Sequence, residues 1–199
     1  MTSKFKKAYT SNGEEIKDLL FIKPNVYGDD RGFFFESWNQ KDWEEILNIN
    51  NQSRVNFVQD NHSKSSKGVL RGLHFQRNPN AQGKLVRCIN GEIYDIAVDL
   101  RKASKTFGKW SGINLSDKNK NQFWIPEGFA HGFLTLSDTA EVLYKTSNYW
   151  RKECEISLLW NDPEIKIEWP LELIKSNVLL SEKDKYAKKL SQINKDLLF

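Results

Sequence analysis

Two segments, FVQDNHS at residues 57–63 and GVLRGLHFQ at residues 68–76, decide the fold of this chain. They hold His62 and His74, two of the three histidines in the sequence, and both read as β-strands bounded by glycine or polar residues. The third histidine, His131, lies in a similar segment, IPEGFAHGF. Histidine is the side chain that gives and takes protons most readily near neutral pH. This placement predicts a proton-transfer site inside a β-barrel.

The remainder of the chain continues the pattern of short strands between turns. Besides a first strand from Ile16 to Ile22, strands are expected over residues 55–60, 69–76, 84–90, 92–99, 110–115, 122–125, 131–136 and 140–147. Strands at this spacing, with Gly, Asn and Asp at the breaks, are typical of an all-β sandwich or barrel. With 199 residues and no repeat or linker, the sequence predicts one all-β domain.

The helices are expected to be short and peripheral. Trp43, Ile46 and Leu47 share one face of an amphipathic helix that begins near Asn39. Beyond Pro170 the chain is expected to turn helical, with a one-sided apolar stripe formed by Tyr186, Leu190, Ile193 and Leu197. Residues 1–16 are polar and predict a peripheral or poorly ordered extension.

The strand over residues 69–76 contains a conflict. Strict alternation places Arg71 and His74 on opposite faces. Glycine inside a strand often marks a bulge, so an irregularity at Gly72 would bring both side chains into one cavity. The sequence therefore predicts a bulge at this glycine.

The composition fits a soluble globular protein of the cytoplasm. The net charge of +4 has no basic stripe with interleaved aromatics in mid-chain, which argues against nucleic acid as a partner. Two distant cysteines, Cys88 and Cys154, give neither a disulfide framework nor zinc spacing, as expected in a reducing compartment. The N-terminus lacks the apolar core of a signal peptide, and no segment has the length of a membrane span.

Polar side chains gather in the strands that would surround His74. Gln59, Asn61, Arg71 and Lys84 lie in adjacent predicted strands and would be costly to bury unless they bind something. Arg and Lys together indicate an anion or a developing oxyanion. Dinucleotide-binding, phosphate-loop and nucleophile-elbow motifs are all missing from the sequence.

A metal site is an alternative interpretation of the histidines. Pro126-x-Gly128-x-x-His131 resembles the second cupin motif, whose histidine can ligate metal. The first cupin motif usually offers a His-x-His pair, whereas this chain offers only His74 there. A three-histidine site would need His62, His74 and His131 to converge. We expect no metal.

Three further residues have both a structural and a functional interpretation. Tyr144 reads as a core aromatic, or as an acid facing a histidine across a cavity. Asp99 and Asp184 are candidates for a carboxylate that orients a histidine and raises its basicity. Asp184 also fits the first turn of a helix after Ser181.

Besides the two opening segments, several ordered motifs lie over about residues 20–185: GDDRGFFFES at 28–37, QGKLVR at 82–87, VDLR at 98–101, WIPEGFAHGF at 124–133, YKT at 144–146, WNDP at 160–163 and LSEKD at 180–184. Together these motifs resemble the dTDP-4-dehydrorhamnose 3,5-epimerase family, whose fold is a cupin-like jelly-roll barrel. The chain departs from the family in a longer N-terminus and an extended stretch between Pro170 and Leu180.

The resemblance implies a cofactor-free isomerase acting beside the 4-keto group of a nucleotide-linked sugar. By this likeness His74 is the base, assisted by Asp184, while Lys84 stabilises the enolate and Tyr144 returns a proton from the opposite face. The positions matching substrate contacts are Arg31, Glu36, Gln59, Asp60, Asn61, Arg71, His131, Trp150, Glu155 and Lys183. The family's members are typically homodimers that exchange an N-terminal segment.

The leading hypothesis is inversion of C3 and C5 in dTDP-4-keto-6-deoxyglucose. One alternative is inversion of a single centre, or action on another 4-keto nucleotide sugar, such as a GDP- or CDP-linked sugar or a heptose. Two alternatives from other classes are a metal-dependent cupin dioxygenase and a non-catalytic sugar-binding cupin.

Overall fold

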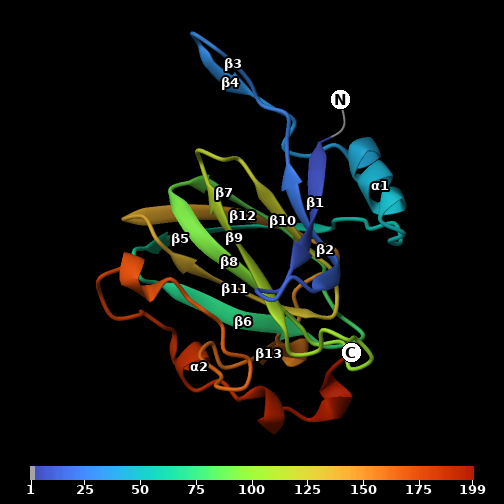
Figure 1. Cartoon of the computed structure of the whole chain (residues 1–199), viewed down its shortest axis with the longest axis vertical. Helices are drawn as coiled ribbons and strands as arrows, with labels where there is room; N and C mark the ends of the chain where they lie inside the picture. Colours follow the sequence, from blue (N-terminus) through green and yellow to red (C-terminus); the bar gives the residue numbers. More distant parts are fainter. Residues whose placement is uncertain (1–2) are drawn as a thin grey trace.

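The computed structural model describes residues 3–199, and two antiparallel sheets packed face to face make up its body (Figure 1). The first sheet has the order β1 (Lys4–Tyr9), β2 (Glu15–Lys23), β10 (Gln122–Ile125), β7 (Lys84–Asn90), β12 (Thr139–Thr146) and β5 (Gln59–Ser66). The second has the order β13 (Glu155–Ser157), β6 (Leu70–Gln76), β11 (Phe129–Thr135), β8 (Glu92–Asp99) and β9 (Trp110–Ser116). The chain crosses repeatedly between the sheets, which confirms the predicted all-β jelly roll.

The remaining elements are short. A separate hairpin, β3 (Tyr27–Asp29) and β4 (Gly32–Phe34), projects from the body (Figure 1). The helices are α1 (Gln40–Ile49) and α2 (Glu182–Lys185), and the 3₁₀ turns are Lys152–Cys154, Leu171–Leu173, Leu190–Gln192 and Lys195–Leu197. None of the helices in residues 3–199 has the length and apolar character that crossing a bilayer requires.

Strand alternation divides the core into layers. On β8, Ile93 and Ala97 face the space between the sheets, whereas Ile96 and Val98 face outward. The outer face of the first sheet is covered by α1, whose Trp43, with Ile46 and Leu47, packs on the sheet. The Asn39 side chain accepts hydrogen bonds from the first backbone amides of α1, so the predicted helix start is confirmed.

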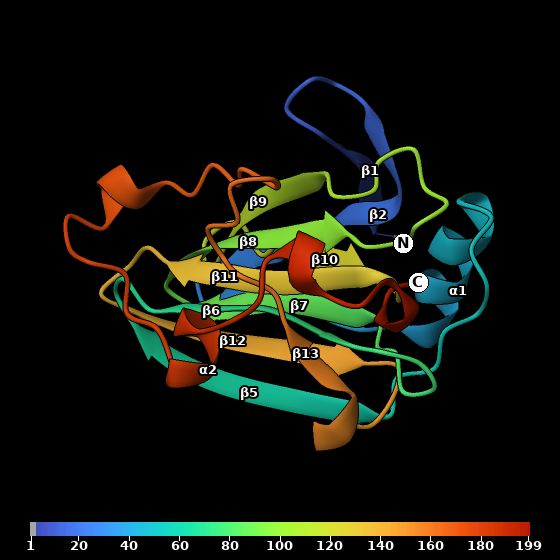
Figure 2. The same ribbon diagram turned by 90° about the horizontal axis from the view of Figure 1, so that it is seen from below.

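The outer face of the second sheet is covered by the C-terminal segment (Figure 2). The prediction of a regular helical stripe there is wrong: Ile193 is buried, but Tyr186 is 70% exposed, and only α2 and short 3₁₀ turns form. The cause is that the backbone bonds to strand edges. Leu179 pairs with the segment entering β6, and Lys188 bridges to Leu158, so these peptide groups are not available to a helix.

Two other boundaries differ from the sequence predictions. Residues 4–9 of the expected polar extension form strand β1, because Ala8 is buried between the sheets while the lysines around it face outward; Met1 and Thr2 lie outside the described residues. The strand expected over residues 55–60 begins only at Gln59 and runs to Ser66. Phe57 packs instead against aromatic rings beside α1, which draws the preceding residues away from the sheet.

The irregularity predicted at Gly72 is present. β6 contains one extra residue here, because Arg71 and His74, three positions apart, pair with Phe133 and His131, two positions apart. Gly72 has φ +124°, and the Gly72–Leu73 peptide bond is cis. The bulge turns both Arg71 and His74 toward one cavity, as expected from the sequence.

Replacing Gly72 by alanine should destabilise the fold severely. An added Cβ would lie 2.5 Å from the Gly132 Cα, at a backbone angle that L-residues rarely adopt. We expect a loss of about 3–5 kcal/mol in the free energy of unfolding, measured by urea denaturation. The control is Gly13→Ala in the β1–β2 turn, because Gly13 has φ +80° with no atom within 4 Å of an added Cβ. Equal losses in both variants would contradict the role of close packing.

Candidate active site

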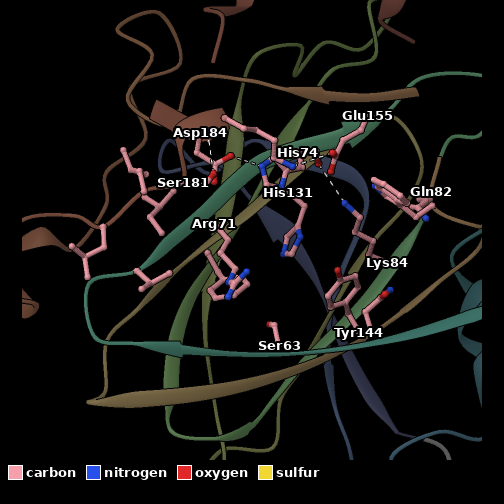
Figure 3. Close-up of a pocket in the computed structure, with 18 of the residues that line it drawn as sticks. Ser63, Arg71, His74, Gln82, Lys84, His131, Tyr144, Glu155, Ser181 and Asp184 are labelled. Atoms are coloured by element: carbon pink, nitrogen blue, oxygen red, sulfur yellow. Dashed lines mark hydrogen bonds and ion pairs between the residues drawn. The ribbon is translucent and has the colours of Figure 1, made fainter. Parts of the chain in front are cut away.

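A cavity of about 590 Å³ lies between the two sheets, and the α2 segment forms part of its rim (Figure 3). The strands β5, β7 and β12 of the first sheet and β6, β11 and β13 of the second each contribute side chains. Of the residues predicted for the site, the structure brings together His74, Tyr144, Asp184, Lys84, Gln59, Asn61, Arg71, His131, Trp150, Glu155 and Lys183.

His74 on β6 forms a pair with Asp184 on α2. The His74 Nε2 atom lies 2.5 Å from the Asp184 Oδ1 atom, and Asp184 is almost fully buried. Burial lowers the pKa of His74 below its usual value, although the Asp184 carboxylate acts in the opposite direction. Burial alone would raise the pKa of Asp184, but the hydrogen bond to His74 lowers it. The pair therefore holds a neutral imidazole and an ionised carboxylate at neutral pH, the state a general base needs.

The local sequence explains how Asp184 reaches His74. The Ser181 hydroxyl accepts a hydrogen bond from the Asp184 amide and so caps the single turn of α2. Lys183 forms an ion pair with Glu155 at 3.0 Å, between its ammonium nitrogen and a carboxylate oxygen, which ties α2 to β13. Since β13 pairs with β6, both ends of the His74–Asp184 contact are anchored to the same strand.

Tyr144 and Lys84 lie on the opposite wall, because β12 and β7 belong to the first sheet (Figure 3). Burial lowers the pKa of Lys84 to about 8, and its ammonium donates a long hydrogen bond of 3.4 Å to the His74 carbonyl oxygen. Burial raises the pKa of Tyr144, so its phenol keeps the proton at neutral pH. The cavity thus has a neutral imidazole on one wall and a protonated phenol on the other.

A second histidine–carboxylate pair is formed by His131, which lines the cavity, and Asp95, which does not. The His131 Nε2 atom is 2.8 Å from Asp95 Oδ1, and both residues are buried. Burial raises the pKa of Asp95, and its second carboxylate oxygen has no hydrogen-bond partner within the described part of the chain. The sequence interpretation chose Asp99 as a candidate for orienting a histidine, and this was wrong. Asp99 ends β8 and binds Arg101 and the following turn instead.

Polar residues of β5 and β6 extend the site toward its mouth. Gln59 and Asn61 are two positions apart on β5, so they share a face, and this face lines the cavity. The Gln59 side-chain amide donates to the Asn61 side-chain oxygen at 2.9 Å. The Arg71 guanidinium donates to the Ser65 hydroxyl at 3.0 Å and keeps one edge toward the cavity. An arginine at this position suits a phosphate group.

Three residues predicted to contact substrate lie away from this cavity. Asp60 points to the outer face of the first sheet, where it accepts from the Lys145 ammonium at 2.9 Å, since alternation separates it from its neighbours on β5. The Arg31 side chain, 90% exposed, binds Asp29 in the projecting hairpin, and Glu36 accepts from Asn39 just after it. Within one chain, none of the three lines the cavity.

The three histidines do not converge. His62 lies on the outer face of β5, where its Nε2 atom is 3.1 Å from Glu141. No group of three or more potential metal ligands forms among residues 3–199. The three-histidine arrangement considered from the sequence is therefore not formed.

Sequence reasoning missed Asp95, Gln76 and Gln82 as contributors to the site. Asp95 could have been found, because alternation along β8 places it on the inward face beside Ala97. The two glutamines carry no such signal. Both side chains donate hydrogen bonds to a loop that comes more than sixty residues later in the chain.

Comparison with known proteins shows the family of the chain. The family model described as dTDP-4-dehydrorhamnose 3,5-epimerase matches residues 13–192. The chain belongs to this family. A dTDP-4-dehydrorhamnose 3,5-epimerase from Shigella flexneri is 61% identical over 170 residues, covering 85% of this chain and 90% of the relative. The resemblance inferred from the sequence motifs is confirmed.

Solved structures of the epimerase family superimpose closely on the fold. The crystal structure of the Legionella pneumophila dTDP-6-deoxy-D-glucose-3,5-epimerase in complex with dTDP-4-keto-L-rhamnose has a TM-score of 0.87 and 47% identity, covering 98% of this chain and 97% of that one. A 3′-monoepimerase from Streptomyces bikiniensis in complex with dTDP-quinovose has a TM-score of 0.79 and 28% identity, covering 87% and 84%. The fold thus accommodates both double and single epimerases.

Proposed function

We propose that this chain, as one epimerase domain, inverts C3 and C5 of dTDP-4-keto-6-deoxyglucose and yields dTDP-4-keto-rhamnose. The observation that carries the proposal is the placement of the His74–Asp184 pair and Tyr144 on opposite walls of one cavity. Inversion needs a base on one face of the sugar and an acid on the other. The similar double epimerase with bound dTDP-4-keto-L-rhamnose supports the choice of substrate.

The first step is removal of a proton next to the 4-keto group. Such a proton is weakly acidic, so the base must be placed beside it and the negative charge on oxygen must be stabilised. The neutral His74 imidazole accepts the proton, and Asp184 stabilises the imidazolium that forms. The electron pair of the broken C–H bond moves into the enolate, whose oxygen carries the charge. The buried Lys84 ammonium lines the cavity and is placed to bind that oxygen.

The second step is reprotonation from the opposite face. The Tyr144 phenol gives its proton to the carbon, the enolate returns to a ketone, and the centre is inverted. The tyrosinate then recovers a proton from solvent and His74 releases one, which closes the proton balance. The Arg71 guanidinium favours the transient tyrosinate, since its charge acts to lower the pKa of Tyr144 against the effect of burial.

We further propose that the enzyme is a cytoplasmic homodimer. The β3–β4 hairpin projects from the body and exposes Phe33 and Phe34, which a second copy would cover (Figure 1). Arg31 and Glu36, which lie on or next to this hairpin, cannot line the cavity of their own chain. Exchange of the segment would place them at the partner's cavity, where the resemblance assigns them to substrate.

The test is an assay of the purified protein with a panel of 4-keto nucleotide sugars in heavy water, followed by NMR. We expect deuterium at both C3 and C5 of the dTDP-linked 6-deoxy sugar. Exchange at one centre only would replace the proposal by a monoepimerase, the activity of the Streptomyces bikiniensis neighbour. Loss of activity on chelation would favour the dioxygenase-type cupin, and binding without any exchange would favour a sugar-binding protein.

The pH dependence follows from the two shifted groups. Because the pKa of His74 is lowered, the base stays neutral at pH 7 and is lost only as the pH falls below about 6.5, its usual value. Lys84 acts as a cation, so its contribution is present below its pKa of about 8 and is lost as the pH rises through that value. We expect a bell-shaped profile of kcat/KM with its alkaline limb near pH 8. Constant activity up to pH 10 would contradict the role of the Lys84 charge.

A further inference from the structure

The segment Asn148–Arg151, which connects β12 to β13, is held by the side chains of three glutamines. Its backbone makes few bonds to other backbone groups; instead, glutamines from three different parts of the chain bind four consecutive residues. The Gln82 side chain donates to the Asn148 backbone oxygen at 2.7 Å, and the Gln59 side-chain oxygen accepts from the Trp150 backbone amide at 3.2 Å. We call these three side chains, Gln59, Gln76 and Gln82, the glutamine clamp.

Gln76 is the centre of the clamp. Its amide nitrogen donates to the Tyr149 carbonyl oxygen at 3.1 Å and to the Asn80 carbonyl oxygen at 2.7 Å, while its oxygen accepts from the Arg151 amide at 2.5 Å. Both N–H groups are therefore used, and the side chain is only 3% exposed. A saturated, buried amide of this kind fixes the groups it binds, because leaving any of them unpaired would be costly.

The clamp holds one side chain at the mouth of the cavity. Trp150 lines the cavity yet is 52% exposed, so little packing of its own fixes the ring. The residues before and after it, Tyr149 and Arg151, are both bound by Gln76, and its own amide by Gln59. The ring direction is thus set by the backbone that the clamp holds. A half-exposed indole at the mouth of a nucleotide-sugar site is suited to stack on the nucleobase.

We propose that Gln76, with Gln59 and Gln82, is a positioning residue that presents Trp150 as a stacking platform for the base of the nucleotide. The proposal rests on the nucleotide-sugar function proposed above. It adds a residue that touches no substrate: Gln76 is not among the side chains that line the cavity. Its effect should therefore appear in nucleotide affinity, and the proton transfers at His74 should be spared.

The test is Gln76→Met, which keeps the length of the side chain and removes its hydrogen bonds. We expect faster hydrogen exchange at the amides of Trp150 and Arg151, and a rise of about tenfold in both the dissociation constant of thymidine diphosphate and the KM, as for loss of a hydrogen bond to a buried group. The kcat should change less than about threefold, since the catalytic pair is untouched. If this variant does not fold, Gln82→Ala removes a single bond of the clamp; because Gln82 itself lines the cavity, its readout is faster hydrogen exchange at Trp150 and Arg151, and unchanged exchange there would overturn the clamp.

Two further variants separate a positioning role of Gln76 from a general loss of stability. Gln122→Met is the matched control, because Gln122 is also buried and donates to a loop carbonyl, that of Ser37, away from the cavity. It should leave thymidine diphosphate affinity unchanged. In a Trp150→Ala background, Gln76→Met should cause no further loss of affinity, because the platform is already gone. An equal further loss there would overturn the proposal.

Failure of the clamp and failure of the proposed substrate give different results in these experiments. Unchanged hydrogen exchange at residues 150 and 151 in Gln76→Met would overturn the clamp, whatever the nucleotide data show. Failure of the unmodified protein to bind thymidine diphosphate would overturn the platform role together with the dTDP-linked substrate, even if exchange in that segment responds as expected.

Discussion

Replacing His74 by asparagine should lower turnover by about 10³-fold to 10⁴-fold, because it removes the base that we propose starts both inversions. Asparagine keeps a polar side chain of similar reach that can still bond to Asp184, so the fold should be retained. Deuterium incorporation from heavy water should fall in parallel at C3 and C5, since one base serves both centres. The measurement is NMR of product and of recovered substrate in the same reaction.

The control for this variant is His62→Asn. His62 lies 3.1 Å from Glu141 on the outer face of β5, twelve positions before His74, and does not line the cavity. Its replacement should leave turnover within about twofold of the unmodified enzyme, as for surface changes in general. Exchange that continues at one centre in His74→Asn would show that a second base serves that centre, and the single-base mechanism would then have to be abandoned.

The sequence was sufficient to predict most of the strands and the all-β class, because alternation and turn residues are local signals. Gly72 predicted the bulge that brings Arg71 and His74 together. These features depend on neighbours a few positions away. Tyr144 and Asp184, in contrast, were only candidates from the residues themselves, and the resemblance to a family was needed to assign them to His74, since no local spacing links them to it.

The failures have a common physical origin in contacts between distant parts of the chain. The apolar stripe after Pro170 fits a helix, but the backbone near Leu179 bonds to the segment entering β6 instead. Asp95 and Asp99 lie on the same face of β8, and the register of β11 places His131 opposite Ala97, midway between them; His131 bonds to Asp95, whereas Asp99 is bound by Arg101 and Ser104. Periodicity cannot predict such register, because it contains no information about which strand lies alongside.

Replacing Tyr144 by phenylalanine should separate proton exchange from inversion. The base on the opposite wall is intact, so His74 can still remove a proton and return one, with solvent deuterium entering the substrate at its original configuration. Reprotonation from the other face requires the Tyr144 hydroxyl, so net inversion should fall by about 10²-fold or more. NMR in heavy water measures both quantities in one sample: deuterated starting material accumulates while the epimerised product does not.

Tyr94→Phe is the matched control for the loss of a hydroxyl. Burial raises the pKa of Tyr94 as it does for Tyr144, but Tyr94 faces outward on β8 and packs against Trp169. It should invert the substrate at the normal rate. If Tyr144→Phe still inverts both centres, the acid must be another group on that wall, and Lys84 is then the first to examine because its ammonium lies on the same sheet. If exchange and inversion are lost together, Tyr144 is needed before the enolate forms, as a group that orients the ketone for His74.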